Sequence, residues 1–242
     1  MMKGQRITVS FRRLAFVVSI LALSFADASA QSTVFNIPSS DVQSPGKVYL
    51  EADFMIHFGS LREGGYQEYG SRLVVGLPGN MEVGINGFHV RSESPEPIEL
   101  QPNFKWQFYS DESRGLAAAA GVLVSIPVTR RKEGTTTAMF YVVGSKTFQG
   151  RYGPRFTAGG YTLAGWLEDG TTKHGVLLGY EQPVTSKISF LADWASGNND
   201  YGYVVAGTGI TLSPKDAIYA GYNFGNYGRG NNSLGLYYGR TF

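Results

Sequence analysis

The C-terminal residues 234–242 (LGLYYGRTF) constrain the fold more than any other part of the chain, because they alternate strictly between two kinds of side chain. One face carries the large apolar residues Leu234, Leu236, Tyr238 and Phe242. The other face carries Gly235, Tyr237, Gly239 and Thr241. Alternation at a period of two is typical of a β-strand with one apolar face. The chain therefore ends in an amphipathic strand whose last residue is aromatic.

The same alternation recurs at regular intervals and predicts twelve strands, with ten as the alternative. Residues 47–58 and 98–109 give the clearest patterns, and their apolar faces carry no charge. Their length suits a tilted strand that crosses a bilayer, which needs about 9–11 residues. Pro102 lacks a backbone donor, so we expect a bulge or break there. The predicted strands are 47–58, 69–77, 81–90, 98–109, 115–127, 137–148, 155–167, 174–182, 187–195, 203–212, 217–225 and 233–242.

The connections between these strands alternate in length. The odd-numbered ones, such as 59–68 and 128–136, are longer on average than even-numbered ones such as 78–80 and 213–216. This asymmetry and an even strand number are typical of transmembrane β-barrels. No run of 18 apolar residues occurs after the N-terminal region, which excludes a helical membrane protein. A soluble β-barrel or sandwich is a weaker alternative, because a closed soluble barrel of twelve strands would be too wide to fill with side chains.

The terminal-phenylalanine strand resembles the closing strand of bacterial outer-membrane β-barrels, although Arg240 stands where that family usually has an aromatic or apolar residue. The resemblance implies that this strand is read by the barrel-insertion machinery. Residues 193–203 together with 221–226 (GYNFGN) resemble uncharacterised porin-like barrels over about the last quarter of the chain. We therefore expect an all-β, antiparallel, up-and-down transmembrane barrel over residues 47–242.

Residues 1–30 have the features of a cleaved secretory signal peptide. Basic residues precede the apolar core 14–25, and Ala28-Ser29-Ala30 is a cleavage site. Its removal takes four basic and one acidic residue from the 21 and 19 of the chain, leaving 17 and 18. Residues 31–46 are polar and interrupted by Pro38 and Pro45, so we expect a periplasmic lead-in. The chain has no cysteine and therefore no disulfide. These features predict a protein of the bacterial outer membrane.

Aromatic residues fall near the ends of the predicted strands, as the interfacial girdles of a membrane barrel require. The girdle candidates are Trp106, Phe108, Trp166, Trp194 and Phe242.

The polar faces of the strands would point into the lumen, where their charges would decide function. Hairpin geometry predicts that Arg72 lies diagonal to Asp53 and opposite Asn86, and that Lys105 lies near Glu82. It also places Glu181 across a short turn from Lys187. Acidic and basic residues look nearly balanced. The candidates for lining or constricting the lumen are Glu51, Asp53, His57, Arg72, Glu82, Asn86, Glu99, Asn103, Lys105, Glu181, Lys187 and Asp193.

These patterns predict a porin-like channel for passive diffusion of small polar solutes. The alternative is a closed structural barrel whose charges pair and fill the lumen, since twelve strands lie between filled and open barrels. A lipid hydrolase is less favoured, with His89 and Ser92 as the nearest approach to a base and nucleophile. We expect no metal, cofactor or nucleic acid. The expected partners are outer-membrane lipids and lipopolysaccharide, whose phosphates could meet Arg130-Arg131-Lys132 in a loop.

Overall fold

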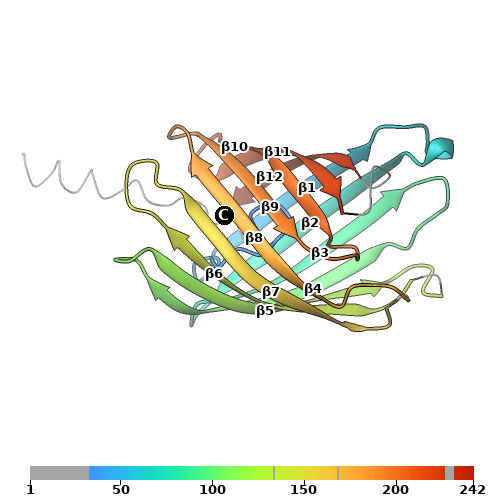
Figure 1. Cartoon of the computed structure of the whole chain (residues 1–242), viewed down its shortest axis with the longest axis horizontal. Helices are drawn as coiled ribbons and strands as arrows, with labels where there is room; N and C mark the ends of the chain where they lie inside the picture. Colours follow the sequence, from blue (N-terminus) through green and yellow to red (C-terminus); the bar gives the residue numbers. More distant parts are fainter. Residues whose placement is uncertain (1–32, 133, 168, 227–231) are drawn as a thin grey trace, which may run out of the picture.

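The chain forms a closed antiparallel barrel of twelve strands (Figure 1). The structure is a computed structural model that describes residues 33–132, 134–167, 169–226 and 232–242. The predicted signal peptide lies outside these residues. The strands are β1 Val48–His57, β2 Tyr66–Leu77, β3 Met81–Arg91, β4 Glu99–Asp111, β5 Leu116–Pro127, β6 Thr137–Thr147, β7 Arg155–Gly165, β8 His174–Pro183, β9 Ile188–Ala195, β10 Tyr203–Thr211, β11 Asp216–Gly225 and β12 Ser233–Thr241.

The first and last strands close the barrel. Glu51 on β1 lies opposite Arg72 on β2 and opposite Gly239 on β12. Next to this pairing, the backbone N–H of Phe242 donates to the carbonyl of Val48 at 2.8 Å. The prediction of twelve strands is therefore confirmed, and the alternative of ten is wrong. β2 begins three residues earlier than predicted, at Tyr66, so Glu68 also belongs to a strand.

Each strand separates an interior face from an exterior face, as the period of two predicts. On β6, Tyr141 and Val143 are 7% and 0% exposed, whereas Phe140 and Val142 between them are 49% and 54% exposed. The exterior of the barrel is thus an apolar belt, and the interior is shielded from solvent.

Of the bulge or break predicted at Pro102, the bulge is wrong, but the ladder is broken on one side because Gln101 and Pro102 have no paired residue on β5. Pro102 lies opposite Ile85 on β3 in regular register. On the other side, the register between β4 and β5 is the same at Leu100 and at Asn103, and it shifts only between Gln107 and Tyr109. The missing donor of a proline removes one ladder hydrogen bond without inserting a residue, so the strand keeps its phase.

The two ends of the barrel differ in their connections. One end carries the longer loops, including 58–65 with a 3-10 turn η1 at Leu61–Glu63; we call it the long-loop end. The other carries shorter turns such as 78–80 and 184–187, and we call it the short-turn end. Among the described residues, no helix is long and apolar enough to cross a membrane.

The expected girdle residues lie at or near these ends. Trp106 and Phe108 are half-exposed on β4 toward the short-turn end, with ring centroids 5.9 Å apart. Phe242 is half-exposed beyond the last residue of β12. At the long-loop end, Trp166 is exposed just past β7, and Trp194 on β9 donates to Asn226 in a loop at 3.3 Å.

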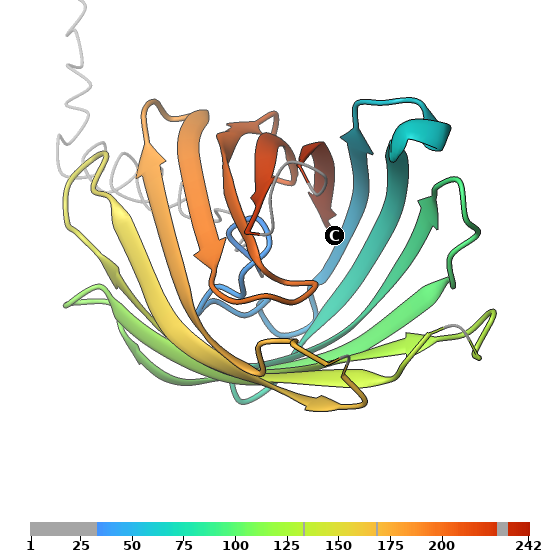
Figure 2. The same cartoon turned by 45° about the vertical axis from the view of Figure 1, so that its right-hand side comes forward.

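Residues 33–43 lie inside the barrel wall (Figure 2), and residues 44–46 are exposed where the chain meets it; we call residues 33–46 the lumen segment. The sequence predicted a periplasmic lead-in for residues 31–46, but the described part of that range is folded into the interior. The segment enters at the short-turn end, where the N–H of Gly46 donates to the carbonyl of Gly76 at 2.9 Å.

Candidate functional site

The interior wall carries three clusters of ionised side chains. The first is centred on Arg72, whose Nε lies 2.8 Å from Asp53 Oδ2 and 3.3 Å from Glu51 Oε1. Tyr49 donates its hydroxyl to the second oxygen of Glu51 at 2.5 Å. The diagonal pairing of Arg72 with Asp53, and its position opposite Asn86, are both as the sequence predicts.

The second cluster joins β3 and β4. Lys105 Nζ lies 3.0 Å from Glu82 Oε1, and both side chains are almost completely buried. The predicted proximity of these two residues is therefore present. Asn103 lies next to them and donates to Asn86 at 3.4 Å, which links this cluster toward Arg72.

The third cluster was missed by the sequence reasoning. Arg155 at the start of β7 lies directly opposite Glu181 on β8, with Nε 3.5 Å from Glu181 Oε2, and it also binds Asp41 of the lumen segment. The predicted pairing of Glu181 with Lys187 is wrong, because Glu181 lies opposite Leu191 and Lys187 is exposed in the turn 184–187. Arg155 lies at an inward-facing position of its strand. The register between the predicted strands 155–167 and 174–182 could therefore have shown that it lies opposite Glu181.

Asp193 holds the far end of the lumen segment. Its Oδ2 accepts hydrogen bonds from three successive backbone N–H groups, those of Phe35 at 2.8 Å, Asn36 at 2.8 Å and Ile37 at 3.1 Å. A carboxylate that binds consecutive amides in this way uses charge-assisted hydrogen bonds, which are about twice as strong as neutral ones. The sequence marked Asp193 as a lumen residue but gave no sign of these donors.

Further contacts hold the middle of the segment. Lys105 Nζ donates to the carbonyl of Asp41 at 2.6 Å, and Gln107 donates to the carbonyl of Ser40 at 2.9 Å. Glu82 Oε2 accepts from the backbone N–H of Gln43 at 2.8 Å. The segment thus contacts walls on several sides and crosses the interior of the barrel.

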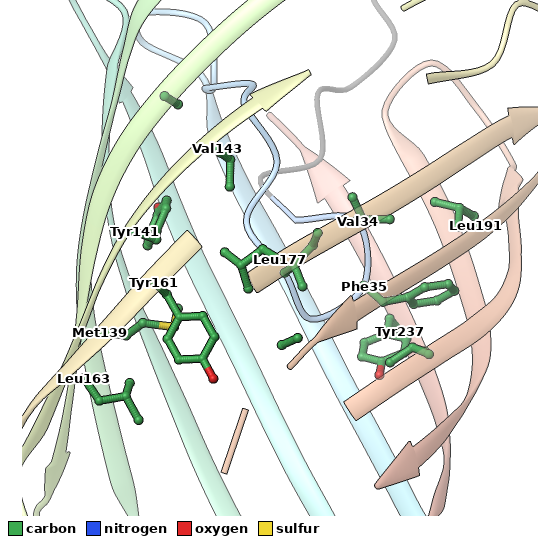
Figure 3. Packing of buried hydrophobic residues seen from close by; sticks show 14 residues of the cluster. Val34, Phe35, Met139, Tyr141, Val143, Tyr161, Leu163, Leu177, Leu191 and Tyr237 are labelled. Carbon is green, nitrogen blue, oxygen red and sulfur yellow. The ribbon is translucent and has the colours of Figure 1, made fainter. Parts of the chain in front are cut away.

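Half of the interior is apolar, which differs from the wholly polar lumen that we expected. Phe35 of the lumen segment packs against Tyr237, with ring centroids 5.8 Å apart (Figure 3). Its ring also lies edge-on to Tyr219, with centroids 6.5 Å apart. The buried apolar residues of this cluster are Val34, Phe35, Ile37, Ala119, Met139, Tyr141, Val143, Tyr161, Leu163, Leu177, Leu191, Ala195, Val205 and Tyr237. The strand residues of this cluster lie at inward positions between β5 and β12, and Val34, Phe35 and Ile37 of the segment belong to the same cluster.

A loop at the long-loop end also folds inward. Tyr161 donates its hydroxyl to the carbonyl of Ser196, and Asn199 donates to Tyr161 at 2.7 Å. Tyr201 in the same loop packs against the apolar cluster, and its burial raises the pKa of the phenol well above the ordinary value. This loop therefore covers part of the interior at the long-loop end.

His57 lies near the long-loop end rather than in the charged clusters. Its Nδ1 donates to the carbonyl of Asn232, and its ring stacks on Tyr66 with centroids 5.6 Å apart. A cavity of about 260 Å³ beside it extends under the loop 58–65 to Arg91. These contacts give His57 hydrogen-bonding and stacking partners but no carboxylate.

The interior wall carries more acidic than basic side chains, although the chain as a whole is nearly neutral. The basic residues that balance the sequence lie largely in exposed loops and turns, as Arg131, Lys132 and Lys187 do. Seven carboxylates face three cationic side chains at inward positions of the described strands: Glu51, Asp53, Glu68, Glu82, Glu99, Glu181 and Asp193 against Arg72, Lys105 and Arg155. The near balance of charge that we expected in the lumen is absent.

The pair considered for hydrolysis does not assemble. His89 is exposed on the outer face of β3, opposite Tyr69. Ser92, just beyond the strand, donates its hydroxyl to the carbonyl of Ser94. A serine nucleophile needs a base within hydrogen-bonding distance, whereas the Ser92 hydroxyl donates to a backbone carbonyl.

Comparison with solved structures shows the fold. The KdgM porin matches with a TM-score of 0.56 at 4% identity, over 80% of this chain and 99% of that one. The COG4313 outer membrane channel from Pseudomonas putida F1 matches with a TM-score of 0.54 at 11% identity, over 84% and 98%. No known family matches the sequence, and no curated protein matches it significantly. The chain has the fold of outer-membrane β-barrels.

Proposed function

We propose that the protein is a porin-like channel of the bacterial outer membrane, exported by its signal peptide, through which small polar solutes diffuse and cations are favoured. The observation that carries this is the set of seven carboxylates and three cationic side chains inside a barrel with an apolar exterior. Ionisable groups at membrane depth are costly, and they typically mark ion or substrate pathways. The KdgM porin and the COG4313 channel, by their names, are channels of the same fold, which supports the proposal.

The excess of carboxylates supports the preference for cations. In surroundings of low dielectric constant, an uncompensated carboxylate lowers the energy of a passing cation much more than it would in water. Rings of acidic side chains select cations in channels for this reason. Solutes would pass along the wall formed by β1 to β4, where the Arg72 and Lys105 clusters lie.

A closed structural barrel is the second candidate, and one observation favours it. Glu51, Asp53, Glu82 and Lys105 are each no more than 5% exposed. Side chains that line an open aqueous pore would be reached by water. The channel proposal therefore requires that the lumen segment leave the interior.

Ion flux into liposomes tests the choice between these candidates. The test compares the mature chain with a variant that lacks residues 33–44, whose removal leaves every strand of the barrel intact. We expect the variant to carry a larger flux than the full chain. A variant that is folded, as judged by heat-modifiable gel mobility and a β-type circular dichroism spectrum, and that carries no flux would contradict the channel proposal.

We propose two partners at the surface. The strand ending at half-exposed Phe242 would be read by the insertion machinery, so Phe242→Ser should lower the yield of folded barrel in cells; an unchanged yield would contradict this. The exposed run Arg130-Arg131-Lys132 would contact lipopolysaccharide phosphates by charge. Serine at all three positions should weaken binding to lipopolysaccharide, and equal binding would contradict this contact.

A further inference from the structure

The barrel wall recognises the backbone of the lumen segment, not only its side chains. Asp193 binds the N–H groups of residues 35–37, and Glu82 binds the N–H of Gln43. Lys105 and Gln107 bind the carbonyl oxygens of Asp41 and Ser40. Donors and acceptors placed to match a main chain are what a peptide-binding site provides. All these groups come from strand side chains, so the segment is held as a ligand and not as a part of the sheet.

The wall also provides pockets for particular side chains of the segment. Arg155 binds the carboxylate of Asp41 through both terminal nitrogens, with Nη2 2.9 Å from Oδ1. Phe35 occupies a pocket beside Tyr219 and Tyr237. An arginine fork on a carboxylate is specific in geometry as well as in charge. The site therefore selects an aromatic or apolar residue followed, several residues later, by a carboxylate.

Two glycines shape the wall for the segment. A Cβ on Gly76 would lie 2.1 Å from the carbonyl oxygen of Ser44, and a Cβ on Gly221 would lie 3.1 Å from the ring of Phe35. Any side chain at position 76 would overlap the segment, because 2.1 Å is far inside van der Waals contact. The absence of side chains at these positions makes room for the peptide.

We propose that the lumen is a binding site for short peptides that carry a carboxylate and form a turn like that of residues 33–38, and that the lumen segment is its resident ligand. The proposal rests on the proposed channel function and deepens it: the segment closes the path while it is bound, and short acidic peptides of the same pattern compete for its place. Withdrawal of the segment removes the three amide donors of Asp193 and leaves Arg155 and Lys105 with their wall partners Glu181 and Glu82. A peptide that supplies an amide backbone and a carboxylate restores the lost contacts.

The absence of native cysteine permits a test on the full chain. The hydroxyl oxygens of Ser40 on the segment and Ser145 on β6 are 2.5 Å apart, close to the sulfur–sulfur distance of a disulfide at about 2.05 Å. In the variant S40C/S145C, oxidation would tie the segment into the lumen and reduction would release it. The single variants S40C and S145C, treated in the same way, are the matched controls.

The probe is a fluorescent synthetic peptide with the sequence of residues 33–46. The lumen segment is part of the same chain, so it competes with the probe at a high effective concentration. Probe binding is therefore also measured with the Asp41→Asn variant, in which the segment binds more weakly and the barrel wall is unchanged. Loss of a charge-assisted pair should raise the apparent affinity for the probe about tenfold over wild type. The oxidised form of S40C/S145C should bind the probe at least about tenfold more weakly than the reduced form of the same variant. Wild type is not the reference here, because Arg155 Nη2 donates to the hydroxyls of both Ser40 and Ser145.

Equal binding to the oxidised and reduced forms, or no gain with Asp41→Asn, would overturn the proposal. So would the absence of any binding. Ion flux recorded on the same preparations distinguishes failure of the proposed channel from failure of the proposed peptide-binding site. Flux that the peptide does not block contradicts the peptide site and leaves the channel standing. Peptide binding to a folded protein that carries no flux contradicts the channel and leaves the binding site standing.

Discussion

Replacing Asp193 with asparagine should loosen the lumen segment by an amount that the structure allows us to estimate. Three backbone N–H groups donate to one carboxylate oxygen, at 2.8, 2.8 and 3.1 Å. Hydrogen bonds to a charged acceptor contribute about 1.5–3 kcal/mol each, and neutral ones about 0.5–1.5 kcal/mol. The change to a neutral amide therefore removes about 1 kcal/mol per bond, or about 3 kcal/mol in all. This corresponds to a rise of roughly a hundredfold in the fraction of molecules with the segment withdrawn.

Labelling of a buried reporter cysteine measures that fraction. Ser39 of the segment is 1% exposed, so Ser39→Cys should react with a small thiol reagent only when the segment leaves the lumen. When withdrawal and return are fast, the labelling rate follows the withdrawn fraction. We expect Asp193→Asn, added to the reporter, to raise the rate by about a hundredfold.

Asp169→Asn is the matched control for this prediction, because Asp169 is an exposed carboxylate in the loop after β7. It should leave the labelling rate unchanged. An unchanged rate in the Asp193→Asn variant, with the barrel still folded, would show that the carboxylate does not hold the segment and would refute the reasoning.

Two further substitutions test the interior. Lys105→Met leaves the Glu82 carboxylate buried without its cation and should destabilise the barrel by about 3–5 kcal/mol in urea unfolding followed by tryptophan fluorescence. Adding Glu82→Gln should recover much of that loss, and a double variant as unstable as the single one would contradict a paired interaction. Gly221→Val should push Phe35 from its pocket and speed labelling of the Ser39→Cys reporter. Gly144→Ala, where the nearest atom is 3.7 Å away, should not; equal rates in the two variants would contradict the packing.

The barrel itself was predictable because the alternation of apolar and polar residues is visible within each strand alone. A strand between lipid and interior must alternate, and that alternation is visible in residues such as Phe140 to Val143 without knowledge of any neighbour. Pairings within one hairpin or between adjacent hairpins, such as Arg72 with Asp53, follow from register. The Glu181–Lys187 pairing failed because the turn was assumed to bring together residues that the register separates.

The lumen segment was not predictable from the same signals. Its residues have no periodicity, because their order comes from side chains scattered over β3, β4, β7 and β9. These contacts join positions up to 158 residues apart, as between Phe35 and Asp193. The excess of acidic side chains was visible in the candidates themselves, six acidic against Arg72, Lys105 and Lys187, but a count over the whole chain obscured it by including basic residues in loops.

The direction of ion selectivity tests the central claim most directly. The measurement is the reversal potential in a planar bilayer under a potassium chloride gradient, for the full mature chain and for the variant lacking residues 33–44. We predict discrete current steps that are more frequent in the variant, with a reversal potential displaced toward the potassium equilibrium value by the interior carboxylates. A displacement toward the chloride value, or a folded variant that stays silent, would contradict the account.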